Sequence, residues 1–103
     1  MKLYIMTDME GVTCVAGTWD DINPGGQIRE AAKQFMTHDV NAAIEGALEG
    51  GAQDIVVLDG HGAYFNIIAE KLNPKAQLVW GRYSRSLEGL DETFDLAFQI
   101  GSH

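Results

Sequence analysis

Short apolar runs and one long periodic stretch alternate along the chain. Four runs of apolar and β-favouring residues predict strands, and these cover residues 2–7, 54–58, 77–80 and 94–100. The first two runs are apolar almost throughout, without an alternation of polar residues. This pattern is typical of strands that are buried on both faces of a parallel sheet.

Between the first two runs, apolar residues recur at intervals of three and four from Gln27 to Glu49. This spacing predicts one amphipathic helix, which ends at the pair Gly50-Gly51. The stretch 12–26 is rich in Gly, Asp, Asn and Pro and predicts a loop over the end of the first strand. Residues 63–71 predict a second, shorter helix.

The order strand, helix, strand between residues 2 and 58 implies a right-handed crossover between parallel strands. The predicted fold class is therefore α/β: an open, mainly parallel sheet flanked by helices in three α/β/α layers. With 103 residues the chain forms at most one small domain.

The first strand ends at two carboxylates, in Asp8-Met9-Glu10-Gly11. Residues two apart in an extended chain point the same way and lie about 6.5 Å apart, so both side chains are aimed at a common point. Two converging carboxylates repel each other unless a cation or a shared proton lies between them. Asp8 and Glu10 are therefore candidate metal ligands, and a solvated acidic turn is the alternative interpretation.

Histidines follow two other predicted strands, His61 in Asp59-Gly60-His61-Gly62 and His103 in Gly101-Ser102-His103. Ligands of open parallel sheets bind outside the carboxyl ends of the strands, so we expect these residues to meet the two acids at one edge. Carboxylate and imidazole ligands together suit zinc. Asp59 is expected to accept the imidazole proton of His61 and fix its tautomer. A purely structural role of His61 in a turn stays open.

If Asp8 bridges two ions about 3.5–4 Å apart, the site can activate water as a nucleophile, which is hydrolase chemistry.

The composition of the chain argues against some classes of partner. The formal charge of −8, from 15 acidic and 7 basic residues, argues against nucleic-acid partners. No apolar run is long enough to span a membrane. Arg82 and Arg85 could bind a substrate carboxylate, although surface arginines are common.

The single Cys14 cannot form an internal disulfide, which agrees with a reducing compartment. The uncharged stretch at the start of the sequence is too short for a secretory signal, because the acidic Asp8 follows after five uncharged residues. We therefore expect a cytoplasmic location. Unpaired sheet edges on so small a domain favour association into a homo-oligomer.

Four motifs resemble the zinc-dependent D-aminopeptidases of the dipeptide-transport-associated family, in the same order and at similar spacings. They are Asp8-Met9-Glu10-Gly11, Asp59-Gly60-His61, Gly89-Leu90-Asp91-Glu92-Thr93-Phe94-Asp95 and Gly101-Ser102-His103. The resemblance implies a dinuclear zinc peptidase that removes N-terminal residues, typically D-amino acids such as D-Ala, from short peptides. It also implies that Asp8 bridges the ions, that Glu10 and His61 complete one site, and that His103 serves the other.

Members of that family are more than twice as long, and they supply another glutamate ligand and a catalytic histidine beyond the matching region. The resemblance thus implies that residues 1–103 are the N-terminal, metal-binding α/β portion of a longer aminopeptidase. Catalytic residues are expected beyond residue 103, so we predict weak metal binding and little turnover from this chain alone.

Two other functions stay open. Haloacid-dehalogenase-type phosphatases begin with a strand followed by Asp-x-Asp-Gly and use magnesium, and Asp8-Met9-Glu10-Gly11 is similar apart from the Glu. Those enzymes need Ser or Thr after the second strand, where this chain has His61, and imidazole nitrogens favour zinc over magnesium. The third hypothesis is a non-catalytic α/β binding or assembly domain with its acids and histidines on the surface.

Overall fold

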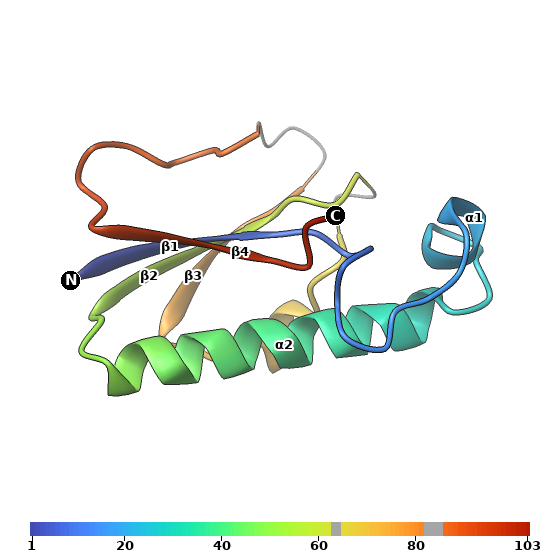
Figure 1. Cartoon of the computed structure of the whole chain (residues 1–103), viewed down its shortest axis with the longest axis horizontal. Coiled ribbons are helices and arrows are strands. Elements are labelled where there is room, and N and C mark those ends of the chain that lie inside the picture. Colours follow the sequence, from blue (N-terminus) through green and yellow to red (C-terminus); the bar gives the residue numbers. More distant parts are fainter. Residues whose placement is uncertain (63–64, 82–85) are drawn as a thin grey trace.

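A parallel sheet lies against one long helix (Figure 1). The computed structural model describes residues 1–62, 65–81 and 86–103. Over these ranges the elements follow one another in this order: β1 (Lys2–Thr7), α1 (Trp19–Ile22), α2 (Arg29–Glu49), β2 (Asp54–Asp59), the 3₁₀ turn η1 (Ala69–Lys71), β3 (Ala76–Val79) and β4 (Leu96–Ile100).

The four strands are arranged in the order β3-β2-β1-β4, and every neighbouring pair is parallel. β1 is central, since Leu3 is in register with Ile55 of β2 on one side and with Leu96 of β4 on the other. The chain adds β2 and β3 on one side of β1 and then returns to add β4 on the other. The predicted open parallel α/β sheet is confirmed, and its strand order reverses between β1 and β4, where such sheets bind ligands.

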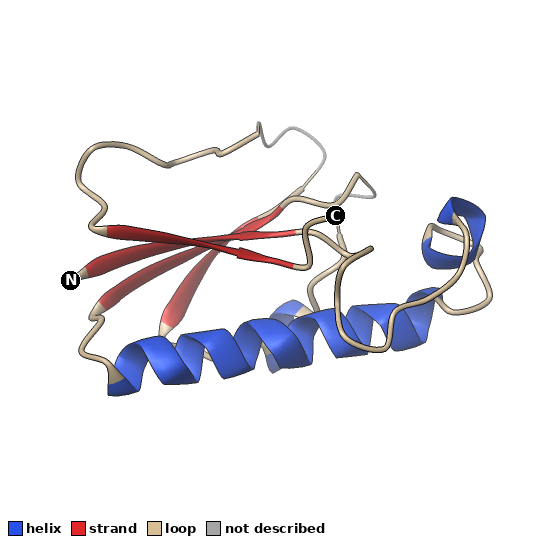
Figure 2. Ribbon diagram, viewed as in Figure 1, coloured by secondary structure: helices blue, strands red, loops and turns tan. Residues whose placement is uncertain are grey.

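α2 lies along one face of the sheet (Figure 2), and the hydrophobic core lies between them. Leu3 and Ile5 of β1 and the alternate residues of β2 face the apolar stripe of the helix, which is fully buried at Met36, Val40 and Ile44. The three-to-four spacing of those helical positions is therefore the spacing that the core requires.

The described end of the connection from β3 to β4, residues 86–95, lies over the face of the sheet opposite to α2 (Figure 1). The β1–α2–β2 crossover leads from β1 toward the β3 edge of the sheet, whereas the step from β3 to β4 leads back past β1 to the other edge. Because both connections are right-handed and run in opposite directions, they lie on opposite faces of the sheet. On the face opposite to α2 the described part of the connection, residues 86–95, is irregular. It occupies the place where a three-layer arrangement has its second helical layer.

Tyr4 holds this connection against the sheet. Its side chain is fully buried, its hydroxyl donates a hydrogen bond of 2.8 Å to the Glu88 carbonyl, and its ring meets Phe94 edge-on at 5.3 Å. The main-chain N–H of Asp95 also donates a hydrogen bond of 2.8 Å to the carbonyl oxygen of Lys2. These contacts place the start of β4 beside β1.

Element ends differ from the sequence prediction by a few residues, and one helix is much shorter. The predicted helix over 63–71 is reduced to Ala69–Lys71 within the described residues, which exclude 63–64. The reason is that the carboxylate of Asp59 accepts the main-chain N–H groups of Asn66 and Ile67, which a helix would use internally. Conversely, the predicted loop over 12–26 contains α1, whose start is capped by Asp21 accepting the Thr18 N–H.

Within the described residues, no helix combines the length and the apolar character that a membrane span requires. The longest, α2, carries charged residues along its exposed side.

Tyr4 causes the fold to lose stability as the pH becomes strongly alkaline. Burial, with a smaller contribution from the negative charge of Glu88, raises the pKa of Tyr4 from 10.0 to about 12. The folded protein keeps this proton to higher pH than the unfolded chain, so the associated stability is complete below pH 10 and is lost as the pH rises toward 12. We expect Tyr4→Phe to remove this part of the decline. Urea unfolding of both proteins between pH 7 and about pH 11.5 measures it.

At pH 7 the same substitution should cost about 0.5–1.5 kcal/mol, the net value of one hydrogen bond. Equal losses of stability above pH 10 in the wild type and in Tyr4→Phe would show that the phenol does not carry this dependence.

Candidate metal centre

The carboxyl ends of β1, β2 and β4 meet at one edge of the sheet. Pairing between β1 and β4 continues past the strands, because Asp8 N donates to Ile100 O at 2.8 Å and Gly11 N donates to Gly101 O at 2.7 Å. The segment that carries Asp8 and Glu10 is thereby joined directly to the segment that carries His103. His61 reaches the same edge from β2, one strand away.

Two glycines allow this close approach. Gly101 has φ of 74°, a conformation that side chains disfavour, and a Cβ there would collide with Asp8 O. A Cβ on Gly11 would collide with the main-chain oxygen of Ser102. Both positions therefore exclude larger residues, and the last three residues can fold back over the end of β1.

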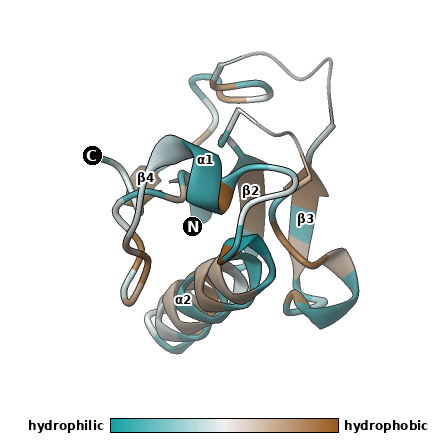
Figure 3. Cartoon of the chain, turned by 90° about the vertical axis from the view of Figure 1, so that its right-hand side faces the viewer, coloured by the Kyte–Doolittle hydropathy of each residue, from teal (hydrophilic) through white to brown (hydrophobic). Residues whose placement is uncertain are grey.

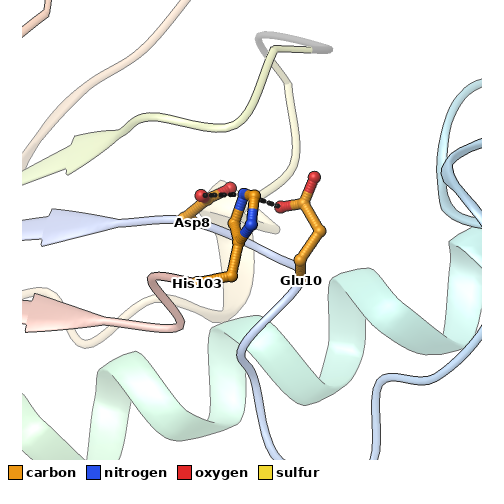
Figure 4. Close-up of side chains that lie close together, drawn as sticks. All are labelled: Asp8, Glu10 and His103. Atoms are coloured by element: carbon orange, nitrogen blue, oxygen red, sulfur yellow. Dashed lines mark ion pairs between the residues drawn. The ribbon is translucent and has the colours of Figure 1, made fainter.

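All four predicted ligands lie in one cluster. Single ligand atoms of Asp8, Glu10 and His103 lie within 4.8 Å of one another, and Figure 4 shows the His103 ring between the two carboxylates. His103 Nε2 is 3.4 Å from Asp8 Oδ2 and 3.7 Å from Glu10 Oε2. His61 Nδ1 is 3.1 Å from Asp8 Oδ1 and 3.2 Å from Glu10 Oε2.

Asp8 meets the two imidazoles with different oxygens. Oδ1 faces His61 and Oδ2 faces His103, so the carboxylate lies between the two rings. A carboxylate that presents one oxygen to each of two nitrogen donors has the arrangement needed to bridge two cations. Glu10 differs, because its Oε2 atom faces both rings.

Asp8 is held in its charged form. Burial by itself raises the pKa of this carboxyl, but hydrogen bonds with Glu10, with the Met9 N–H at 2.8 Å and with His61 outweigh burial and hold the pKa below its usual value. An ionised carboxylate is the form that ligates a metal. Asp8 is thus ready to bind a cation at neutral pH.

The two histidines differ in their surroundings. His61 is 2% exposed and lies beside the Trp19 ring, with 5.4 Å between ring centroids, whereas the His103 side chain is 63% exposed. α1, which carries Trp19, lies at this end of the sheet (Figure 3). The cluster consequently has a closed side at His61 and an open side at His103.

Asp59 has partners other than the one expected for it. Its oxygens accept hydrogen bonds from Asn66 N at 2.7 Å, from Ile67 N at 2.8 Å and from Asn66 Nδ2 at 2.7 Å. Both ring nitrogens of His61 have other partners, so the expected contact from Asp59 to the imidazole is replaced. Asp59 acts on His61 indirectly, because Asn66 Nδ2 also donates to the His61 carbonyl at 3.0 Å.

Three further polar residues lie around the cluster, and the sequence did not predict their roles: Asn23, Arg29 and Asn66. Asn23 Oδ1 lies 2.9 Å from His61 Nε2, and Arg29 donates to Asn66 Oδ1 at 3.1 Å. An asparagine in a Gly-rich loop and an arginine at a helix start have no distinguishing sequence signal, since both are common there. Arg82 and Arg85, the candidates for binding a substrate carboxylate, lie outside the described residues.

Comparison with known proteins identifies the family. The family model described as D-aminopeptidase matches residues 1–103. The chain belongs to the D-aminopeptidase family. It is 36% identical over 107 aligned residues to the D-aminopeptidase of Bacillus subtilis strain 168, an alignment that covers 100% of this chain and 38% of the relative.

A solved structure is similar over the same region. It is described as the Zn-dependent D-aminopeptidase DppA from Bacillus subtilis, a self-compartmentalizing protease, and it matches with a TM-score of 0.90 at 36% identity, covering 100% of this chain and 38% of that one. The chain therefore spans well under half of the length of these D-aminopeptidases. Membership of this family decides against the phosphatase hypothesis.

The glycine contacts at the cluster generate a prediction. Gly11→Ala should lower the free energy of unfolding by about 1–3 kcal/mol, the usual cost of forcing extra atoms into a packed site. Gly46→Ala is the matched control, because a Cβ at this exposed helical position meets nothing within 4 Å. Alanine there should stabilise the protein by about 0.5–1 kcal/mol. Urea unfolding measures both, and a Gly11→Ala protein as stable as wild type would contradict the close approach.

Proposed function

We propose that this chain forms the zinc-binding portion of a D-aminopeptidase that releases N-terminal D-amino acids from short peptides. One observation carries the proposal: two carboxylates each face two imidazoles at the point where the strand order of the sheet reverses. Family membership and the description of DppA as Zn-dependent support the choice of reaction and of metal.

The chemistry of the donors fits zinc. Oxygen and nitrogen atoms from two acids and two histidines converge within hydrogen-bonding or ion-pair distance. Two carboxylates this close repel each other, and a divalent cation between them removes the repulsion. Mixed carboxylate and imidazole ligation is typical of zinc, whereas calcium and magnesium prefer oxygen alone.

We assign the ligands by the atoms that face one another. Asp8 would bridge two ions, Glu10 and His61 would complete the closed site, and His103 would serve the open one. The assignment is supported by the opposite oxygens that Asp8 turns toward the two rings. It also agrees with the burial of His61 and the exposure of His103, since a substrate needs access to one side of the pair.

Zinc in such a centre supplies Lewis-acid activation of water and of a peptide carbonyl. The residues of this chain hold and orient it. Asp8 stays ionised, the buried ring of His61 fixes the closed side, and the exposed ring of His103 leaves room for a peptide to approach. No described residue is assigned as general acid or base, and we expect that group in the part of the longer family members that this chain does not span.

Zinc binding tests this function. Competition with a chromophoric chelator should show zinc binding to the wild type, weakened by His61→Ala and by Asp8→Asn by more than the 10- to 100-fold typical of residues around a metal site. His38→Ala is the matched control, because His38 is 86% exposed on α2 and pairs only weakly with Asp39 at 3.9 Å. Affinity unchanged by both site variants would contradict the assigned centre.

The reaction is tested separately on the zinc-loaded chain, with a D-alanyl dipeptide and its L-counterpart as substrates. Turnover should be low, because the acid–base group is not assigned to this chain, and it should favour the D-peptide. Asp8→Asn should abolish any turnover. A measurable rate that is the same in Asp8→Asn and in the wild type would argue against zinc-dependent peptide hydrolysis at this site.

We also propose that the chain associates with further copies of itself. DppA is described as self-compartmentalizing, and β4 exposes the apolar residues Leu96 and Phe98 at an edge of the four-stranded sheet that the described residues form. Together with Leu3, Ala43 and Ala47 they line a groove of about 420 Å³ between α2 and the sheet. Apolar surface of this kind marks interaction sites.

Sedimentation velocity at tens of micromolar tests the association. The wild type should sediment as an oligomer, and Phe98→Glu should shift it toward the monomer, because the charge would be buried in the contact. Phe35→Glu is the control, since Phe35 is similarly exposed at 40% but does not line the groove. A monomeric wild type, or equal effects of both variants, would count against this interface.

The remaining proposals concern location and other partners. The exposed, unpaired Cys14 fits a reducing compartment, so we place the protein in the cytoplasm. The net charge of −8 opposes binding to nucleic acids and to acidic membrane surfaces. The partners that we propose for this chain are short peptides, the substrates of the proposed reaction.

A further inference from the structure

Asn23 contacts the nitrogen of His61 that faces away from the two acids. Asn23 immediately follows α1, and its Oδ1 atom lies 2.9 Å from His61 Nε2. The other ring nitrogen, Nδ1, faces Asp8 and Glu10. The two nitrogens of one buried ring therefore have partners of different kinds.

A second contact fixes the orientation of the Asn23 amide. Its Nδ2 atom donates a hydrogen bond of 2.9 Å to the carbonyl of Trp19. The amide oxygen must then point at the ring, and this oxygen can only accept a hydrogen bond. His61 Nε2 must carry the proton that it donates.

We propose that Asn23 is a positioning residue that holds a proton on His61 Nε2, so that Nδ1, the nitrogen that faces Asp8 and Glu10, is the one available to ligate zinc. The inference rests on the proposed metal centre. Ligating histidines donate their other ring N–H to a carboxylate, carbonyl or water, which orients the ring and raises its basicity. Asn23 takes the role that the sequence predicts for Asp59.

The backbone does not explain an asparagine at this position. Asparagine is favoured after helices where the chain turns to positive φ, but Asn23 has φ of −93° and ψ of 172°, which any residue adopts. Its two side-chain hydrogen bonds are therefore the features that depend on the amide. Of these, only the bond to His61 reaches the cluster.

Arg29 links the segment that carries Asn23 to the segment that carries His61. Its Nη1 atom donates at 3.1 Å both to the carbonyl of Ile22, next to Asn23, and to Asn66 Oδ1. Asn66 in turn bonds the main chain of His61. Ile22, Arg29 and Asn66 are all buried, so these bonds are protected from water. The segment that carries the amide and the segment that carries the ring are joined through the same guanidinium group.

Three variants test the role of Asn23. Asn23→Ala removes the acceptor, whereas Asn23→Asp keeps an oxygen opposite Nε2. Asn41→Ala is the matched control, because the Asn41 amide also makes two hydrogen bonds, to Lys71 O at 2.8 Å and from Asn73 N at 2.7 Å, with no contact to the cluster among the described residues. Zinc affinity is measured by chelator competition and ring protonation by ¹⁵N NMR of the imidazole.

Asn23→Ala should weaken zinc binding about 10- to 100-fold, Asn23→Asp should restore most of the affinity, and Asn41→Ala should leave it unchanged. The wild type should show a protonated, slowly exchanging Nε2, and Asn23→Ala should lose this slow exchange. Wild-type affinity in Asn23→Ala, or an Asn23→Asp protein as weak as Asn23→Ala, would overturn the inference.

The two proposals fail differently. A wild type that binds zinc while Asn23→Ala binds it equally well would overturn the role of Asn23 and leave the metal centre standing. A wild type that binds no zinc would overturn the metal centre. In that case the ring spectrum of the zinc-free protein decides on Asn23 alone, because an unprotonated Nε2 would contradict the hydrogen bond to its amide.

Discussion

The parallel pairing of β1 with both of its neighbours is the constraint on which the site depends. Parallel strands end at the same edge, so whatever follows β1, β2 and β4 is brought to one place. Two hydrogen bonds beyond the strands, from Asp8 N to Ile100 O and from Gly11 N to Gly101 O, continue that pairing into the loops. Without a central β1, neither histidine would reach the two acids.

This arrangement concentrates charge in a way that does not favour the fold by itself. Asp8 and Glu10 repel each other when both are ionised, and partial burial of Asp8 adds a cost of desolvation that hydrogen bonds offset. The core between α2 and the sheet provides the stability that makes such a cluster tolerable. Binding of a cation only to the folded protein would add further stability by mass action. Fold and site are therefore linked energetically as well as in space.

The surroundings of the cluster divide it into a supported side and an accessible side. His61 is enclosed by α1 and held through Asn66 and Arg29. His103 instead follows the close approach between Gly11 and Gly101 and is exposed. A metal centre of a hydrolase needs both properties, since its ligands must be held while its substrate must enter. The strand order supplies this division, because β2 and β4 approach β1 from opposite sides.

The strands, α2 and the meeting of four candidate ligands could be predicted because each depends on local pattern. Unbroken apolar runs indicate buried strands, and residues that follow parallel strands share an edge. α1 was missed because it is one turn long and contributes a single buried side chain, that of Ile22. The helix expected over 63–71 was too long because Asp59 takes its main-chain donors.

The roles of Asn23, Arg29 and Asn66 could not be predicted from sequence. Their hydrogen-bond partners are distant in the chain: Arg29 and Asn66 are 37 positions apart, and Asn23 and His61 are 38 apart. Only the folded chain brings such pairs together. Asp59 illustrates the converse, since its position two residues before His61 suggests a contact, whereas its oxygens bond to Asn66 and Ile67 instead.

The most direct test of the central claim is crystallographic. Anomalous diffraction from zinc-loaded crystals, measured on both sides of the zinc absorption edge, locates the metal without reference to activity. The account predicts zinc density at the carboxyl edge of the sheet, about 2.0–2.2 Å from an Asp8 oxygen and from His61 Nδ1. Zinc bound elsewhere, with these two side chains left uncoordinated, would contradict it.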